Sequence, residues 1–319
     1  MPTPAPPPAE PHRNRQVAES FGDDPTRYDR ARPSYPAALI ERILAATPGR
    51  SAHASPAVRG VPTTPTAATT PTILDVGIGT GIVARLFRAA GCTVVGVEAD
   101  ERMAEFARLD GTEVEVSTIE AWDPAGRTFD AMVAGQAWHW VDPVAGAAKA
   151  AEALRPGGVF AAFWNVHQPE PEAASAFAEV YRRHAPELPS LRPGIDAVQA
   201  YLGFCDKVAE GLRGADGAFG EPEIWQFEWD RTYARDEWLD VVPTHGGHSL
   251  ISQEQRTALF AALGAVIDGL GGSFAVHYTT VAVAATRFPS SPVRGEPHAP
   301  SAKNVPGATG KAGDPTPEG

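Results

Sequence analysis

The chain has 319 residues, a formal net charge of −12 and a sequence pI near 5.2. This acidic balance argues against a nucleic-acid substrate, because proteins that bind phosphate backbones usually present a basic surface. No run approaches the ~20 apolar residues of a membrane-spanning helix, and the first residues lack the charged-then-apolar pattern of a signal peptide. We therefore expect a cytoplasmic protein, without a membrane partner, whose 2 cysteines are too few for a disulfide framework or a zinc site.

Composition divides the chain into one domain and three segments that have few apolar side chains to bury. Proline, alanine, glycine and small polar residues dominate 1–20, 48–72 and 289–319. We expect the first and last of these to be disordered tails and 48–72 to be a low-complexity insertion loop on the surface. Residues 21–288 are then expected to form a single α/β domain.

Apolar periodicity and turn residues predict the elements of that domain in chain order. Helices are predicted at Pro36–Ala46, Ile82–Ala90, Glu101–Leu109, Pro143–Leu154, Pro171–His184, Arg235–Val241 and Gln253–Leu270. Strands are predicted at Thr72–Val76, Thr93–Glu98, Glu113–Ser117, Phe129–Ala134, Gly158–Trp164, Glu223–Arg231 and Ala275–Thr286.

The order of these elements predicts a Rossmann-like sheet. Strand and helix alternate as far as Trp164, which is typical of a parallel sheet with right-handed crossovers. Residues 166–220 are predicted to be a helical insertion. Because ligands bind past the carboxyl ends of parallel strands, we expect this insertion on the substrate side of the sheet.

The run ILDVGIGTG from Ile73 to Gly81, followed by VVGVEAD, is the most informative motif. Gly77, Gly79 and Gly81 allow a sharp turn and a close approach of the backbone to a ligand, since a Cβ there would clash. Glu98 ends the next strand, where a carboxylate can accept hydrogen bonds from both ribose hydroxyls. The motif therefore predicts a site for a nucleoside-bearing cofactor.

Two cofactor classes fit this glycine turn. Gly79, Gly81 and Ala84 match the GxGxxA variant of the dinucleotide fingerprint, so an NAD(P)-dependent oxidoreductase is one interpretation. Asp75 favours S-adenosylmethionine, because a carboxylate suits an ammonium group and would repel a pyrophosphate. A nucleoside-cofactor-binding protein without catalytic turnover is the non-enzymatic alternative.

Several further segments extend this pattern across the chain: FGDDPTRYDRARPSYP from Phe21, VEVSTIEAW from Val114, FDAMVAGQAWHWVD from Phe129 and LRPGGVFAAFWN from Leu154. With them the sequence resembles the class I S-adenosylmethionine-dependent methyltransferases, in particular the methyltransferase domains that act on small molecules. The resemblance implies seven strands, mostly parallel, helices on both faces, an antiparallel last strand and an N-terminal lid. One departure is Ile78, where most members carry Cys or Ala, and its side chain is expected to point away from the cofactor.

The resemblance also assigns residues to S-adenosylmethionine. The lid would contribute Tyr28 and Arg32, and the loops after the third and fourth strands would meet the adenine and the methionine. For Met103 a place in the core is an alternative, and for Glu120 the alternative is simply to cap its loop. The complete expected set is Tyr28, Arg32, Asp75, Gly77, Gly79, Gly81, Glu98, Ala99, Met103, Thr118, Ile119, Gln136 and Ala137.

A catalytic base is harder to predict. His139 lies between Trp138 and Trp140 after the fourth strand and is the candidate for taking a proton from a hydroxyl acceptor. Packing around the cofactor pocket is the alternative role for His139, and we expect it to dominate. His167, His245 and His248 are competing candidates, and methyl transfer needs no base if the acceptor is already reactive. The sequence thus predicts a methyltransferase for a small-molecule acceptor, with no metal.

Overall fold

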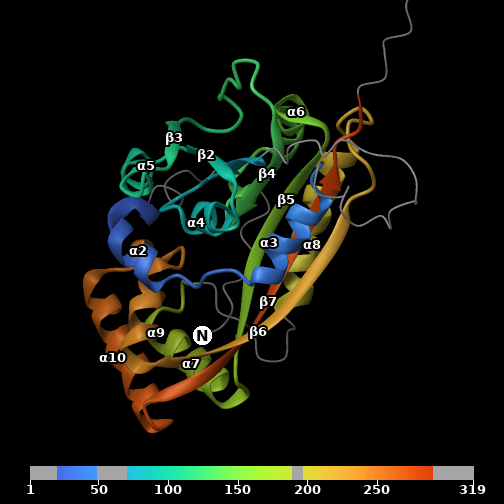
Figure 1. The fold of residues 1–319 in the computed structure, drawn as a ribbon. Helices are drawn as coiled ribbons and strands as arrows, with labels where there is room; N and C mark the ends of the chain where they lie inside the picture. The colour runs from blue at the N-terminus through green and yellow to red at the C-terminus, as the bar shows by residue number, and fades with distance from the viewer. Residues whose placement is uncertain (1–19, 49–69, 189–196, 290–319) are drawn as a thin grey trace, which may run out of the picture. The chain divides into compact units, whose positions relative to one another are not determined.

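A seven-stranded sheet in the order β3-β2-β1-β4-β5-β7-β6 organises the molecule (Figure 1). The computed structural model describes residues 20–48, 70–188 and 197–289, so both predicted tails and most of the insertion loop lie outside the described residues. Strands β1 to β5 run parallel, and β7 runs antiparallel to both of its neighbours. The strands are β1 Thr72–Val76, β2 Thr93–Glu98, β3 Glu113–Val116, β4 Phe129–Gly135, β5 Leu154–Pro169, β6 Glu223–Ala234 and β7 Ser273–Thr286.

Helices cover both faces of this sheet. The α-helices are α2 Pro25–Ala31, α3 Ala37–Ala46, α4 Ile82–Ala89, α5 Glu101–Arg108, α6 Pro143–Ala153, α7 Pro171–His184, α8 Ala197–Arg213, α9 Arg235–Val241 and α10 Gln253–Gly269. Short 3₁₀ turns are η2 Ser20–Asp23, η4 Trp138–Trp140, η5 Val242–Thr244 and η6 His248–Leu250.

The alternation of side chains along each strand produces two separate cores. In β1, Ile73 packs with α3, α4 and α5, whereas Leu74 and Val76 pack with α6 and α8 on the opposite face. A third core joins α7, α9 and α10 to the far ends of β6 and β7. The predicted fold class is therefore confirmed, including the antiparallel last strand.

The predicted boundary between the fifth strand and the helical insertion is wrong. Residues 166–169 were assigned to the helical insertion, but β5 continues through them and pairs with β7 from Val166↔Thr279 to Pro169↔Val276. The partner strand lies more than 100 residues away in the sequence, so the local pattern could not reveal this pairing. The insertion begins only after β5, with α7.

The N-terminal lid is helical and bridges two parts of the molecule. Pro25 occupies the first turn of α2, and the Asp24 side chain caps the helix by accepting a hydrogen bond from the Arg27 backbone N–H. Helix α2 contacts α5 on one side and α9 on the other (Figure 1). Within the described ranges, no helix has the length and apolar character needed to cross a membrane.

Candidate functional site

The glycine turn joins β1 to α4 in a conformation that side chains disfavour. Gly77, Gly79 and Gly81 have φ values of +63°, +58° and +88°, in the left-handed region that glycine adopts readily. A Cβ on Gly77 would lie 2.5 Å from Cβ of Ala137, so the turn packs directly against the loop after β4. The Ile78 side chain is buried against Gly96 on β2, and Ile78 also lines the pocket described below, so its orientation away from the cofactor stays a prediction.

Glu98 holds the turn from the end of β2. Its Oε2 accepts a hydrogen bond from the Gly79 N–H at 2.8 Å, and its Oε1 accepts one from the Asp100 N–H at 3.0 Å. Burial raises the pKa of this carboxyl, and the backbone N–H groups oppose that rise. Each oxygen keeps a second lone pair and can accept a further hydrogen bond, but Glu98 is not among the residues that line the pocket described below.

Asp75 is a buried acid with an unused oxygen. The residue is only 1% exposed, and its Oδ2 has no hydrogen-bond partner within the described part of the chain. Burial raises the pKa of Asp75 well above the usual Asp range, and the neighbouring Glu98 raises it further. A buried carboxylate that lacks a partner is costly, and a ligand ammonium group placed here would offset that cost.

A pocket opens beside Asp75 and encloses about 460 Å³ of atom-free space, part of it open to solvent. Its walls come from α2, the segment before α3, the glycine turn and the ends of β4 and β5. Among the lining residues are Tyr28, Arg32, Tyr35, Asp75, Gly77, Gly79, Gln136 and Asn165. The structure therefore brings together predicted residues from the lid, β1 and β4.

The other predicted cofactor residues lie around the turn but not on the wall of this pocket. Met103 is buried, and its Cε lies 3.7 Å from the position of a Cβ built on Gly79. Ile119 is buried in the core with Trp122, whereas Thr118 is half-buried and Ala99 is exposed. Their assignment to adenine and ribose stays a prediction.

The loop residue Glu120 has a structural partner. Its Oε1 accepts a hydrogen bond from the Asp142 N–H at 2.9 Å. This contact fits the expectation that Glu120 caps its loop.

Arg32 ties the lid to the opposite wall. Its Nη2 donates a hydrogen bond to the Thr244 carbonyl at 2.5 Å, and its guanidinium lies 5.0 Å from the centre of the Tyr28 ring. Its Nε is buried and has no hydrogen-bond partner among the described residues. This cation thus borders the pocket with donor capacity to spare.

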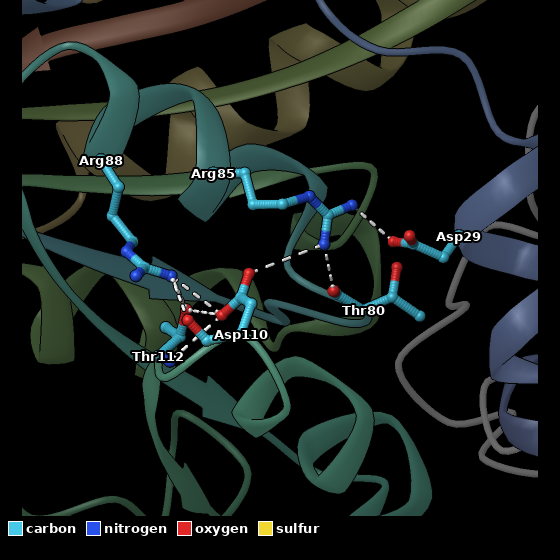
Figure 2. Close-up of polar contacts among 6 residues, drawn as sticks. All are labelled: Asp29, Thr80, Arg85, Arg88, Asp110 and Thr112. Atoms are coloured by element: carbon cyan, nitrogen blue, oxygen red, sulfur yellow. Dashed lines mark hydrogen bonds and ion pairs between the residues drawn. The ribbon is translucent and has the colours of Figure 1, made fainter.

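A second arginine ties the lid to the glycine turn, as Figure 2 shows. Arg85 on α4 pairs with Asp29 on α2 at 2.5 Å and donates a hydrogen bond to the Thr80 carbonyl at 2.9 Å. Arg85 also pairs with Asp110 at 3.9 Å, and one turn further along α4 Arg88 bonds Asp110 and Thr112 (Figure 2).

Asn165 lines the pocket but was not predicted as a site residue, whereas Tyr35 lines it as part of the expected lid segment. Asn165 is buried at the pocket end of β5, where its Nδ2 donates to the Ser34 carbonyl at 3.0 Å and its Oδ1 accepts from Thr280 Oγ1 at 2.6 Å. The Tyr35 ring packs edge-on against Phe163. The signal that could have identified Asn165 is a polar residue at the carboxyl end of an otherwise apolar parallel strand.

His139 is held as a neutral hydrogen-bond acceptor. The Trp164 Nε1–H donates to its Nδ1 at 3.1 Å, so in the neutral ring the proton lies on Nε2. Burial and then the charge of Arg32 lower the pKa of His139 to about 3. The ring also contacts Trp140 and Phe204. This geometry supports a packing role, and a catalytic role for His139 stays a prediction.

The three competing histidines meet beyond Arg32. His167 and His245 stack with ring centres 5.1 Å apart, and burial lowers the pKa of each, that of His167 to about 3. His248 bonds Tyr181 Oη and the His245 carbonyl. Within the described part of the chain, no group of His, Cys, Asp and Glu side chains is arranged to hold a metal ion.

Comparison with known proteins shows which proteins this domain is similar to. Residues 74–162, from β1 to the middle of β5, match the family described as "Methyltransferase domain". The central part of the chain is thus similar to methyltransferase domains. The chain shares its fold with a solved structure from Anaeromyxobacter dehalogenans that bears the name of a type II methyltransferase, with a TM-score of 0.52 and 21% identity over 81% of this chain and 99% of that one.

Sequence relatives agree with this family. A protein of Mycobacterium bovis named an uncharacterized methyltransferase is 32% identical over 153 residues, which are 47% of this chain and 54% of that protein. A ubiquinone biosynthesis O-methyltransferase of Dinoroseobacter shibae is 36% identical over 94 residues, which are 27% of this chain and 38% of that protein. The matches thus span about half the length, or less, of these relatives.

Proposed function

We propose that this methyltransferase transfers the methyl group of S-adenosylmethionine to a small-molecule acceptor. The observation that carries the proposal is the buried Asp75 carboxylate, whose Oδ2 has no partner in the described structure and borders the pocket at the glycine turn. A methionine ammonium group supplies the cation that this oxygen lacks. A pyrophosphate would instead meet a buried negative charge, which disfavours the NAD(P)-dependent alternative.

The remaining groups fit the rest of the cofactor. Arg32 and Tyr28 would receive the methionine carboxylate from the lid side, and Glu98 would accept hydrogen bonds from the ribose hydroxyls. The adenine would lie near Met103, Thr118 and Ile119. The loop residues Gln136 and Ala137 would close the site from β4, where Gln136 adopts a φ of +56° and donates a hydrogen bond from Nε2 to the Asn165 carbonyl.

Bound S-adenosylmethionine supplies an electrophilic methyl group on a sulfonium. The chain contributes alignment, because an in-line displacement depends above all on the approach of the acceptor. The lid contributes by excluding water once Arg32 and Asp29 hold it over the pocket. Methyl transfer then needs a general base only when the atom that receives the methyl group carries a proton that must be lost.

Ligand binding provides the first test. Calorimetry is expected to show that S-adenosylmethionine and S-adenosylhomocysteine bind the purified protein, whereas NADH does not. Each ligand that binds only the native state also raises the melting temperature. Preferential binding of NADH would overturn the proposal.

A substitution at Glu98 tests the ribose site. Glu98→Gln preserves the size of the side chain but replaces one accepting oxygen with an NH₂ group that faces a backbone N–H. We expect at least a tenfold loss of S-adenosylmethionine affinity, since charge-assisted hydrogen bonds contribute about 1.5 to 3 kcal/mol each. Glu101→Gln, on the neighbouring exposed turn, is the matched control. Unchanged affinity in folded Glu98→Gln protein would remove this residue from the site.

A further inference from the structure

Three buried polar atoms without partners mark a place beside the cofactor pocket. Among the described residues, Arg32 Nε, Trp238 Nε1 and His245 Nδ1 are buried and make no hydrogen bond. Trp238 is fully buried and His245 is 9% exposed. Their rings lie 6.3 Å apart, and Arg32 bonds the carbonyl of Thr244, the residue before His245. The three groups therefore belong to one neighbourhood, where α2 meets α9 and η5.

Several polar groups near this place have hydrogen-bond partners. His248 Nδ1 must donate to the His245 carbonyl, which can only accept, and its Nε2 therefore accepts from Tyr181 Oη. Tyr233 and Tyr278 share a hydrogen bond of 2.7 Å. The indole N–H groups of four other tryptophans have partners, at Trp122, Trp164, Trp225 and Trp229.

The charge of this neighbourhood selects the ligand. Arg32 is cationic and the indole of Trp238 can only donate. His245 is kept neutral by burial and by Arg32, and its histidine neighbours His167 and His248 act in the same direction. An electronegative group that accepts hydrogen bonds fits here, and a negative charge is favoured beside the guanidinium.

We propose that these three groups form the acceptor subsite of the methyltransferase and that they bind a carboxylate carried by the methyl acceptor. The inference rests on the proposed methyl transfer, and it specifies the class of acceptor as an organic acid. Arg32 borders both this subsite and the cofactor pocket. A carboxylate held here would thus place the rest of the acceptor next to the methionine end of the cofactor.

The indole N–H signals in a ¹H–¹⁵N spectrum test this subsite directly. The protein, saturated with S-adenosylhomocysteine, is titrated with benzoate and phenylacetate. Benzamide and phenylacetamide, which have similar shapes without the charge, are the matched probes. We expect the acids to move the Trp238 signal saturably and the amides to leave it in place. Trp238→Phe assigns that signal, and Trp229→Phe assigns a control signal whose N–H already bonds Thr280 Oγ1.

A second variant keeps the test decisive if Trp238→Phe fails to fold. His245→Ala is expected to weaken benzoate binding at least threefold while calorimetry shows an unchanged affinity for S-adenosylhomocysteine. A Trp238 signal that ignores the acids, or that responds equally to acids and amides, would overturn the subsite and leave buried water as the partner of these atoms. Failure of the proposed function is a separate result, because S-adenosylhomocysteine itself would then not bind. The titration with the acids is also run in the absence of S-adenosylhomocysteine.

Discussion

At the scale of single residues, folding and binding make opposite demands on Asp75. The carboxylate is buried with a free oxygen in the described structure, so it destabilises the ligand-free protein when ionised. Asp75→Asn removes the charge with little change of shape. We expect this variant to have a higher Tm without ligand, by about 2 to 4 °C for each kcal/mol by which the free energy of unfolding increases. We also expect its affinity for S-adenosylmethionine to be at least tenfold lower. Scanning calorimetry and titration calorimetry measure the two effects, and a variant that loses stability while keeping affinity would contradict this role.

The same residue predicts a pH dependence. Because the pKa of Asp75 is raised in the folded protein, the unfolded chain loses this proton first as the pH rises. As the pH rises from the ordinary pKa of Asp, near 4, to the folded-state pKa of Asp75, the contribution of Asp75 to the free energy of unfolding therefore decreases. Above the folded-state pKa this contribution stays constant. In Asp75→Asn this part of the pH dependence is expected to disappear from the free energy of unfolding.

Substitutions at His139 distinguish a packing role of this residue from a catalytic role. Its Nδ1 accepts the Trp164 indole N–H, and a Gln at this position can still accept that bond, whereas a Phe cannot. If His139 packs, His139→Gln is expected to keep turnover and affinity near the wild-type values. His139→Phe would then lose about 1 to 3 kcal/mol of stability through the unpaired indole. If His139 is instead a catalytic base, both variants are expected to lose about 10²- to 10⁴-fold in turnover. With a pKa of about 3, His139 should leave the rate independent of pH near neutrality.

At the scale of elements, two arginines on α4 provide a matched pair. Both arginines pair with Asp110, but Arg85 also pairs with Asp29 of the lid and bonds the glycine turn, whereas Arg88 also bonds Thr112 (Figure 2). Arg85→Met is expected to weaken S-adenosylmethionine binding about two- to fivefold, since partly exposed ion pairs contribute up to ~1 kcal/mol. Arg88→Met is expected to leave affinity unchanged. Equal effects of the two substitutions in calorimetry would show that the lid is not held through α4.

The elements also show what the sequence could and could not predict. The strand–turn–helix around Gly77 and the carboxylate at Glu98 follow from local rules, and their elements were predicted to within a residue. The continuation of β5 beyond Trp164 and the bond from Arg32 to Thr244, 212 residues along the chain, depend on tertiary contacts. No local pattern encodes which distant backbone meets a given side chain. Asn165, in contrast, has a local signal, because it is a polar residue at the carboxyl end of an otherwise apolar parallel strand.

At the scale of the whole molecule, residues 20–36 act as a strap between the cofactor side and the acceptor side. Asp23 pairs with Arg102 and Asp29 with Arg85 on the cofactor side. Arg30 pairs with Asp240 on α9, and Arg32 reaches Thr244 on η5. The Asn165 side chain adds a bond to the Ser34 carbonyl. One short segment thus aligns the proposed cofactor pocket with the proposed acceptor subsite.

Two N-terminal deletions test this alignment. Removing residues 2–19 is expected to leave the Tm and the S-adenosylmethionine affinity unchanged, because that proline-rich segment has few apolar residues to bury. A matched deletion of 290–319 should behave in the same way. Removing 2–36 takes away Tyr28 and Arg32 as well as the ion pairs to α4, α5 and α9, so at least a tenfold loss of affinity is expected from calorimetry. Circular dichroism should show the sheet intact in all three proteins. If the short and long deletions had equal effects on affinity, residues 20–36 would not be part of the binding site.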